Sequence, residues 1–292
     1  MYEWKGKVAY YRFDSMSDFL SHLEDAKVNA KVFRSLSSQQ TGRKEFTGTN
    51  TYEEAVEIAQ KGWKDGLNKV KDHLRSIKPM GMAIKKQRNV NDLVGGAVLV
   101  PRYLSGEHDN MLNIVRRNSH ERVIDLYASF NANAGYTTER IIKRGAFVCQ
   151  LVDDLESSGI RTNIWACEAA EEGSEKTHTR VCIKQARDIF TINRFAFALA
   201  HPAFLRRLWF RMLETTPDFK ARWDGGYGHP MDSFFWESMA ELARKSKDHF
   251  LFVPGMADLP SLDKLTYQEF IAKTAEFNKK HGGMSLEGFV AN

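Results

Sequence analysis

Apolar and polar positions follow two periods along the chain, and each period predicts one kind of element. Apolar residues three and four positions apart predict helices over 52–77, 138–157, 189–200, 203–215, 231–245 and 266–280. Short apolar runs bounded by glycine, proline or polar clusters predict strands over 8–13, 95–101, 122–128, 160–168, 177–184 and 249–254. Strands that alternate with helices indicate an α/β sheet covered on both faces.

One pair of strands has a predictable direction. Only the short acidic turn 169–176 separates strand 160–168 from strand 177–184. A connection this short joins antiparallel neighbours, whereas parallel neighbours need a longer crossover. We therefore expect these two strands to form a hairpin within the sheet.

Composition places the chain among ordinary globular proteins. It has 292 residues, of which 42% are hydrophobic and 27% charged, which argues against a disordered, collagen-like or membrane-spanning protein. The start of the chain has neither a secretion core nor a transit pattern. Cys149, Cys167 and Cys182 lie in hydrophobic stretches without a C-x-x-C pair, which predicts reduced core cysteines. We expect a cytoplasmic protein with no membrane partner.

The positive charge is concentrated near the start of the chain. The formal net charge is +5, and residues 1–90 hold 17 Lys+Arg against 11 Asp+Glu, while residues 91–292 hold 25 against 26. This asymmetry predicts a basic, mostly helical region over 1–94 and a neutral α/β domain over 95–292. It indicates an anionic partner such as nucleic acid. A solvated helix face is the alternative interpretation.

Cations also alternate with aromatic residues at the N-terminus, where Trp4, Tyr10 and Tyr11 lie among basic side chains. This combination suits single-stranded nucleic acid, because bases stack on rings while phosphates pair with cations. The alternative is a strand over 8–13 that packs on the sheet. The predicted nucleic-acid-binding residues are Lys5, Lys7, Arg12, Lys64, Lys71, Arg75, Lys85, Lys86 and Arg88.

From about residue 120 to 282, the order of predicted elements resembles a von Willebrand factor A-type domain. The resemblance implies a three-layer, Rossmann-like sheet with one antiparallel strand. In that family the first strand ends in Asp-x-Ser-x-Ser, whose oxygens hold a divalent metal. This chain has Tyr127-Ala-Ser129-Phe-Asn131 there, and Asp258 is displaced from the expected position. Without the first carboxylate we expect no metal, since hard cations need anionic oxygen ligands.

The resemblance also implies where a partner would dock. In doubly wound sheets, ligands bind outside the carboxyl ends of the strands. The predicted rim there consists of small polar and aromatic residues, namely Ser129, Asn131, Asn133, Tyr227 and His229. Two interpretations remain open: the rim binds a partner, or it is a relic of an ancestral site.

Two further runs, TYEEAVEIAQKGWKDG and GGAVLVPRYLSGEHDNM, resemble a family of tailed-phage proteins. The chain has none of the P-loop, dinucleotide-binding, zinc-protease or nucleophile-elbow motifs. These features predict a non-enzymatic phage protein without a cofactor, located in the cytoplasm of the infected bacterial host. We expect it to bind single-stranded nucleic acid in viral transcription or replication. The alternative is a protein-interaction adaptor that uses the rim, for example for an AAA+ ATPase.

Overall fold

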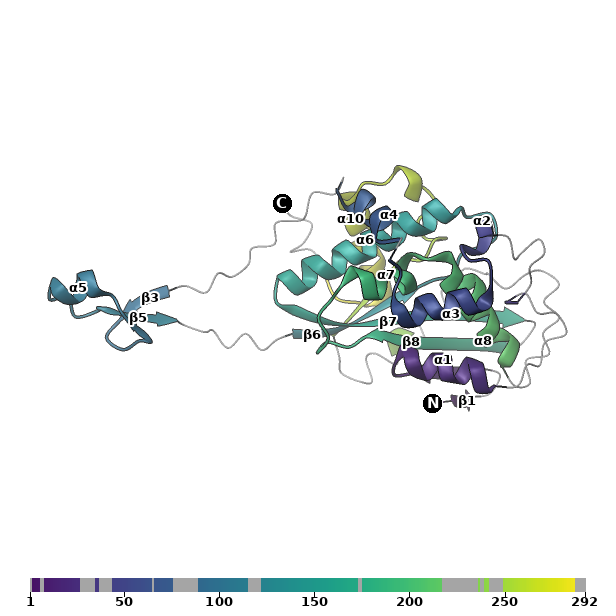
Figure 1. The fold of residues 1–292 in the computed structure, drawn as a ribbon, viewed down its shortest axis with the longest axis horizontal. Helices are drawn as coiled ribbons and strands as arrows, with labels where there is room; N and C mark the ends of the chain where they lie inside the picture. The colour runs from purple at the N-terminus through teal and green to yellow at the C-terminus, as the bar shows by residue number, and fades with distance from the viewer. Residues whose placement is uncertain are drawn as a thin grey trace.

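A computed structural model describes the chain over residues 2–5, 8–26, 35–36, 44–64, 66–75, 89–114, 122–172, 175–216, 236, 239–241 and 249–286. A six-stranded mixed sheet lies at the centre of the main body (Figure 1). Its order is β1 (Tyr2–Lys5), β2 (Val8–Phe13), β8 (Glu175–Lys184), β7 (Ile160–Glu172), β6 (Arg122–Ser129) and β9 (His249–Val253). The predicted α/β class is confirmed.

Strand β6 lies between two parallel neighbours in the sheet. It pairs with β7 from Arg122↔Ile160 onward and with β9 from Ile124↔His249 onward. β7 and β8 pair antiparallel, as predicted from their short connection. β2 then adds to β8 in parallel, and β1 pairs antiparallel with β2 at the edge. The carboxyl ends of β6, β7 and β9 therefore lie at one end of the sheet, and those of β2 and β8 at the other.

Helices cover both faces of the sheet. The larger core packs under α1 (Met16–Asp25), α6 (Thr138–Ser157), α7 (Ile192–Ala200), the π-helix η2 (Phe204–Trp209) and α8 (Phe210–Thr215). The smaller core on the other face contains Tyr127, Trp165 and Phe252, which pack with Trp236 and with Phe277 of α10 (Tyr267–His281). Helix α10 begins with a capping box between Thr266 and Glu269, a signal that fixes its first residue. No described helix is both long and apolar enough to cross a bilayer.

The helix predicted over 52–77 is two helices in the structure. α3 (Tyr52–Lys61) ends at Gly62, whose φ of 86° interrupts the helix, and α4 (Gly66–Arg75) follows. Only glycine adopts such a φ without strain, which explains why the break falls there. Ala55, Trp63 and Val70 are nevertheless all buried, so the apolar pattern continues across the break.

Helices dominate the described N-terminal range, as predicted, but the range is not separate from the sheet. Strand β2 pairs with β8 along its whole length, from Val8↔Lys176 to Phe13↔Val181. Tyr11 and Phe13 are buried in the larger core. The interpretation of 8–13 as a strand that packs on the sheet is therefore confirmed.

Residues 89–114 form a separate small unit, which we call the arm (Figure 1). Its three-stranded sheet has the order β3 (Asn89–Asp92), β5 (Met111–Ile114) and β4 (Ala97–Val98), and α5 (Val100–Leu104) follows β4. The prediction of a buried strand over 95–101 is wrong, because β4 has two residues and both are exposed. The expected division between residues 94 and 95 falls inside the arm. Most of the helix predicted over 231–245 lies outside the described residues.

Gly145 allows α6 and α7 to approach closely. A Cβ at position 145 would lie less than 3.0 Å from the Ala200 Cα and Cβ and from the Leu199 carbonyl oxygen. We expect Gly145→Ala to lower the free energy of unfolding by about 1–3 kcal/mol, because extra volume in a packed core forces a backbone shift. Urea unfolding measures this change.

Gly96→Ala is the matched control, since a Cβ there meets nothing within 4 Å. It should leave stability within about 0.5 kcal/mol of the parent. Equal stability of the two variants would show that the α6–α7 contact tolerates a methyl group.

Candidate functional site

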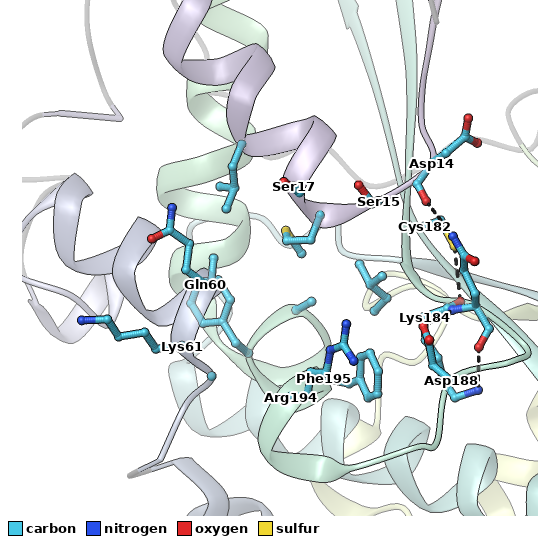
Figure 2. Close-up of a pocket in the computed structure, with 18 of the residues that line it drawn as sticks. Asp14, Ser15, Ser17, Gln60, Lys61, Cys182, Lys184, Asp188, Arg194 and Phe195 are labelled. Atoms are coloured by element: carbon cyan, nitrogen blue, oxygen red, sulfur yellow. Dashed lines mark hydrogen bonds between the residues drawn. The ribbon is translucent and has the colours of Figure 1, made fainter.

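Two adjoining hollows lie where α3 ends. The first, of about 860 Å³, is bordered by the start of α1, the end of β8 and the start of α7 (Figure 2). The second, of about 680 Å³, is bordered by α2 (Lys44–Thr47), the end of α3 and the junction of α7 with η2. Lys61 and Gly62 line both hollows. We call the two hollows and the α3 terminus between them the α3 face.

The first hollow contains one buried cation that is fully engaged. The Lys184 ammonium lies 2.6 Å from the Glu156 carboxylate and donates to the carbonyl oxygens of Thr162 and Gln185. Breaking such a pair leaves an uncompensated buried charge, so Lys184 holds the end of β8 in place. It is therefore a structural residue rather than a ligand-binding one.

The open cations of the first hollow are Arg187 and Arg194. Both are exposed, and neither pairs with a carboxylate among the described residues. The Arg194 guanidinium lies 5.5 Å from the centre of the Phe195 ring, a cation–π contact that limits where it can move. Asp14, Glu24 and Asp188 supply negative charge on the same walls. Of these, Asp14 is paired with Arg12 and Asp188 accepts the backbone N–H of Gln185.

The second hollow contains a buried histidine that presents a hydrogen-bond donor. His201 is 6% exposed and meets the Trp63 ring edge to face, with 4.5 Å between ring centres. Burial, with a smaller effect of Lys69, lowers its pKa to about 3. Its Nδ1 accepts the N–H of Ala203, so the hydrogen of the neutral ring is on Nε2. No described residue partners that Nε2.

Lysines surround this donor. Lys44, Lys64 and Lys69 line the second hollow, all are exposed, and none pairs with a carboxylate among the described residues. Lys61 differs, because it pairs with Glu57 at 2.7 Å. Of the other carboxylates there, Glu54 accepts the Asn50 N–H, and the Glu45 carboxylate bonds to no group among the described residues. The second hollow thus combines surplus positive charge with the neutral His201 donor.

Two buried arginines fix the wall of the second hollow. Arg206 donates to the carbonyl oxygens of Phe46 at 2.6 Å and Tyr136 at 2.9 Å. Arg207 donates to backbone carbonyls on either side of the same wall, those of Ser35, Thr49 and Asn50. Gly48, with φ of 78°, passes so close to His201 that a Cβ would lie 2.7 Å from Cε1. The segment before α3 is therefore held against η2.

Only part of the predicted nucleic-acid-binding set lies at the α3 face. Lys64 lines the second hollow, Lys71 is exposed on α4, and Arg75 ends that helix. Lys5 lies in β1, away from both hollows. Arg12 pairs with Asp14 at 2.7 Å and lies over the Trp165 ring, on the smaller-core face. Predicted residues outside the described part are Lys7, Lys85, Lys86 and Arg88.

Several cations and donors of the α3 face were not predicted as ligand-binding residues: Lys44, Lys69, Arg187, Arg194 and His201. They come from α2, α4, the connection after β8, and α7 with its C-terminal end, which no local motif connects. The one relevant sequence signal is His201-Pro202, which marks the start of a new helix but does not reveal the hollow beside it.

Two of the predicted rim residues at the end of β6 are buried. Ser129 and Asn131 are 0% and 1% exposed. The Ser129 Oγ accepts the Asn131 N–H, and the Asn131 side chain donates to the Ala169 carbonyl oxygen. Neither is therefore part of an accessible surface. Asn133 is exposed, while Tyr227 and His229 lie outside the described residues.

The residues near this rim do not fit a divalent metal. The buried Arg144 guanidinium donates to the Pro254 carbonyl oxygen at 2.8 and 3.0 Å, directly after β9. Asp258 accepts the Gly255 N–H and interacts electrostatically with Arg144, so its negative charge already has a partner. Within the described ranges, no three His, Cys, Asp or Glu side chains are grouped to hold a metal ion.

Comparison with known proteins gives one finding. A family model described as "Domain of unknown function (DUF7192)" matches residues 3–272. Neither the curated proteins nor the solved structures give a match.

Glu168 is a buried acid on β7, next to Ala169, whose carbonyl oxygen accepts from the Asn131 side chain. It is 1% exposed, and no described group bonds its Oε1. Burial raises its pKa from 4.5 to about 8, so the folded protein holds its proton at neutral pH. The unfolded chain releases that proton near its ordinary pKa, and the folded state therefore loses relative stability as pH rises toward 8.

We expect the free energy of unfolding to fall between pH 6.5 and 8 by about 1.4 kcal/mol per pH unit from this group. This window lies above the range in which His201 titrates, which affects stability in the opposite direction. Glu168→Gln keeps the shape without the ionisation and should remove the slope. Chemical denaturation at several pH values measures it, and an equal slope in both proteins would contradict the assignment.

Proposed function

The chain belongs to the DUF7192 family, a domain of unknown function, and from its structure we propose that it is a non-enzymatic nucleic-acid-binding protein. One observation carries this proposal. Five exposed cations without a carboxylate partner among the described residues border the two adjoining hollows: Lys44, Lys64, Lys69, Arg187 and Arg194.

The arrangement of these cations favours a polymer of phosphates over a single small anion. Three border the second hollow and two the first, with the end of α3 between the groups. A nucleic-acid backbone presents one phosphate per nucleotide, so one strand is able to contact both groups. A single strand bends around the end of α3 easily, whereas a duplex is stiff over about 50 nm. We therefore propose single-stranded nucleic acid.

His201 adds a phosphate contact of another kind. Its Nε2–H is a neutral donor, and the low pKa keeps it neutral throughout the physiological range. Backbone phosphates are commonly bound by neutral donors together with Lys and Arg side chains. The start of α6 at Thr138 also borders this hollow, and the helix dipole there favours negative charge.

The scaffold is proposed to be von Willebrand A-like. The strand order β8-β7-β6-β9, with β8 antiparallel, and the position of Ser129 at the end of the central β6 support this. The buried Arg144 beside Asp258 supports a version of the fold that needs no metal. The adaptor alternative, with an AAA+ ATPase as one partner, needs an accessible rim, and the burial of Ser129 and Asn131 disfavours it.

The wider setting follows from the resemblance to tailed-phage proteins and is proposed with the function. In that setting the protein acts in the cytoplasm of the infected host, where viral transcription or replication exposes single strands.

Replacing Lys64 and Lys69 together by Gln should weaken binding to a single strand. Each lost phosphate contact lowers the slope of log affinity against log salt by about 0.7, so the double variant should lose roughly 1.4 from the slope. Fluorescence anisotropy of a labelled oligonucleotide, titrated at several salt concentrations, measures both the affinity and the slope.

Lys279→Gln with Lys280→Gln is the matched control. It removes the same charge from α10, which borders neither hollow, and should keep the parental slope. Binding that does not respond to salt, or equal losses in both double variants, would contradict the α3 face as the binding surface.

A further inference from the structure

The end of the arm exposes an unusual amount of apolar surface. Over the twelve residues 93–104, which we call the arm tip, six large hydrophobic side chains are exposed. Leu104 is 78%, Val94 75% and Leu93 68% exposed. Val98, Val100 and Tyr103 complete the set. Val100, Tyr103 and Leu104 are spaced at three and four residues on α5, so they share one helix face.

The arm does not bury this surface itself. Among the arm residues whose side chains the structure describes, none is buried, so none of them contributes to a hydrophobic core. Its described interactions include the β3–β5 and β4–β5 ladders, short turns, the ion pairs of Arg102 with Glu107 and Asp109, and two side-chain hydrogen bonds to backbone carbonyls. Units below about 40 residues rarely hold one conformation without further stabilisation. A partner surface would supply the missing burial.

The tip lies at the end of the arm far from the points where the chain enters and leaves. Asn89 pairs with Ile114, which places the first and last residues of the arm side by side. Asp92 pairs with Met111 at the other end of the ladder, and the tip follows from there. Figure 1 shows α5 at the far end of the arm, away from the main body. The apolar surface is thus presented outward.

We infer that the arm tips of two copies of this chain pack against each other and make the protein a dimer. The described part of the body offers only Leu36, Val123 and Ile189 as exposed large hydrophobic residues, and these lie on separate elements. The surface that matches the tip in size and character is a second tip. Identical patches related by a two-fold axis form the commonest interface between copies of one chain.

The area of the tip agrees with a dimer of moderate affinity. A buried aliphatic side chain removes roughly 60–120 Å² from water, so six partly exposed ones offer about 350 Å² per tip. Apolar atoms form about 60% of a typical interface, so two tips correspond to roughly 1,200 Å² in total. This is the lower end of the standard range for specific interfaces.

The charges of the arm permit this contact. Arg102 lies 2.5 Å from Glu107 and 3.1 Å from Asp109, so it neutralises part of the arm's negative charge. Two facing tips therefore repel weakly. This inference goes beyond nucleic-acid binding and does not depend on it.

Sedimentation of the full chain over a range of micromolar concentrations tests the inference. The parent should sediment as two chains, and Val94→Asp with Leu104→Asp should weaken association at least tenfold. Ile189→Asp is the matched control: it is 77% exposed on the body and should leave association unchanged. A monomeric parent at every concentration, or association that survives the tip substitutions, would overturn the proposal.

Cross-linking gives a second readout that does not rely on a disruptive change. The described cysteines are buried, so a cysteine introduced at the tip becomes the accessible thiol. With a short bis-maleimide, Leu104→Cys should form a covalent two-chain product and Ile189→Cys should not. Products of equal yield would mean random encounter and would also overturn the proposal. Circular dichroism reports separately whether each variant folds.

Discussion

The hydrogen bonds of two adjacent buried arginines connect parts of the chain that are far apart in sequence. Arg206 and Arg207 lie in the π-helix η2, and their guanidinium groups donate to backbone carbonyls of the segments before α3 and before α6. Burial lowers the pKa of Arg206 to about 10, so it remains charged at neutral pH. A buried charge needs such partners, and those partners fix the wall of the second hollow.

The sheet determines which surfaces are available to a ligand. At the carboxyl end of β6, Ser129 and Asn131 bond to backbone groups, and the buried Arg144 lies beside Asp258. The Ser129 and Asn131 side chains are therefore not available to a ligand at that end. β8 ends opposite the start of β7, and there the first hollow opens between α1 and α7. Among the described residues, the N-terminal segment and the start of α7 build an accessible polar surface there.

Much of the fold could be predicted from local pattern. The strands at 122–128, 160–168 and 177–184 and the helix at 138–157 agree closely with β6, β7, β8 and α6, because each pattern is long and uninterrupted. The break in the helix at Gly62 could not be predicted, because Trp63 and Val70 keep the helical spacing across it. The exposure of Val98 was also unexpected, since an apolar run does not say whether a partner covers it.

The α/β class, the β7–β8 hairpin and the excess of positive charge near the start of the chain could all be predicted from the order of residues. Those properties depend on neighbours a few residues apart. The packing of the elements was needed to show that Lys64 shares a hollow with His201, whereas Arg12 lies over Trp165 on the other face of the sheet. A site assembled from distant segments depends on how helices and strands pack, and composition and spacing do not record that packing.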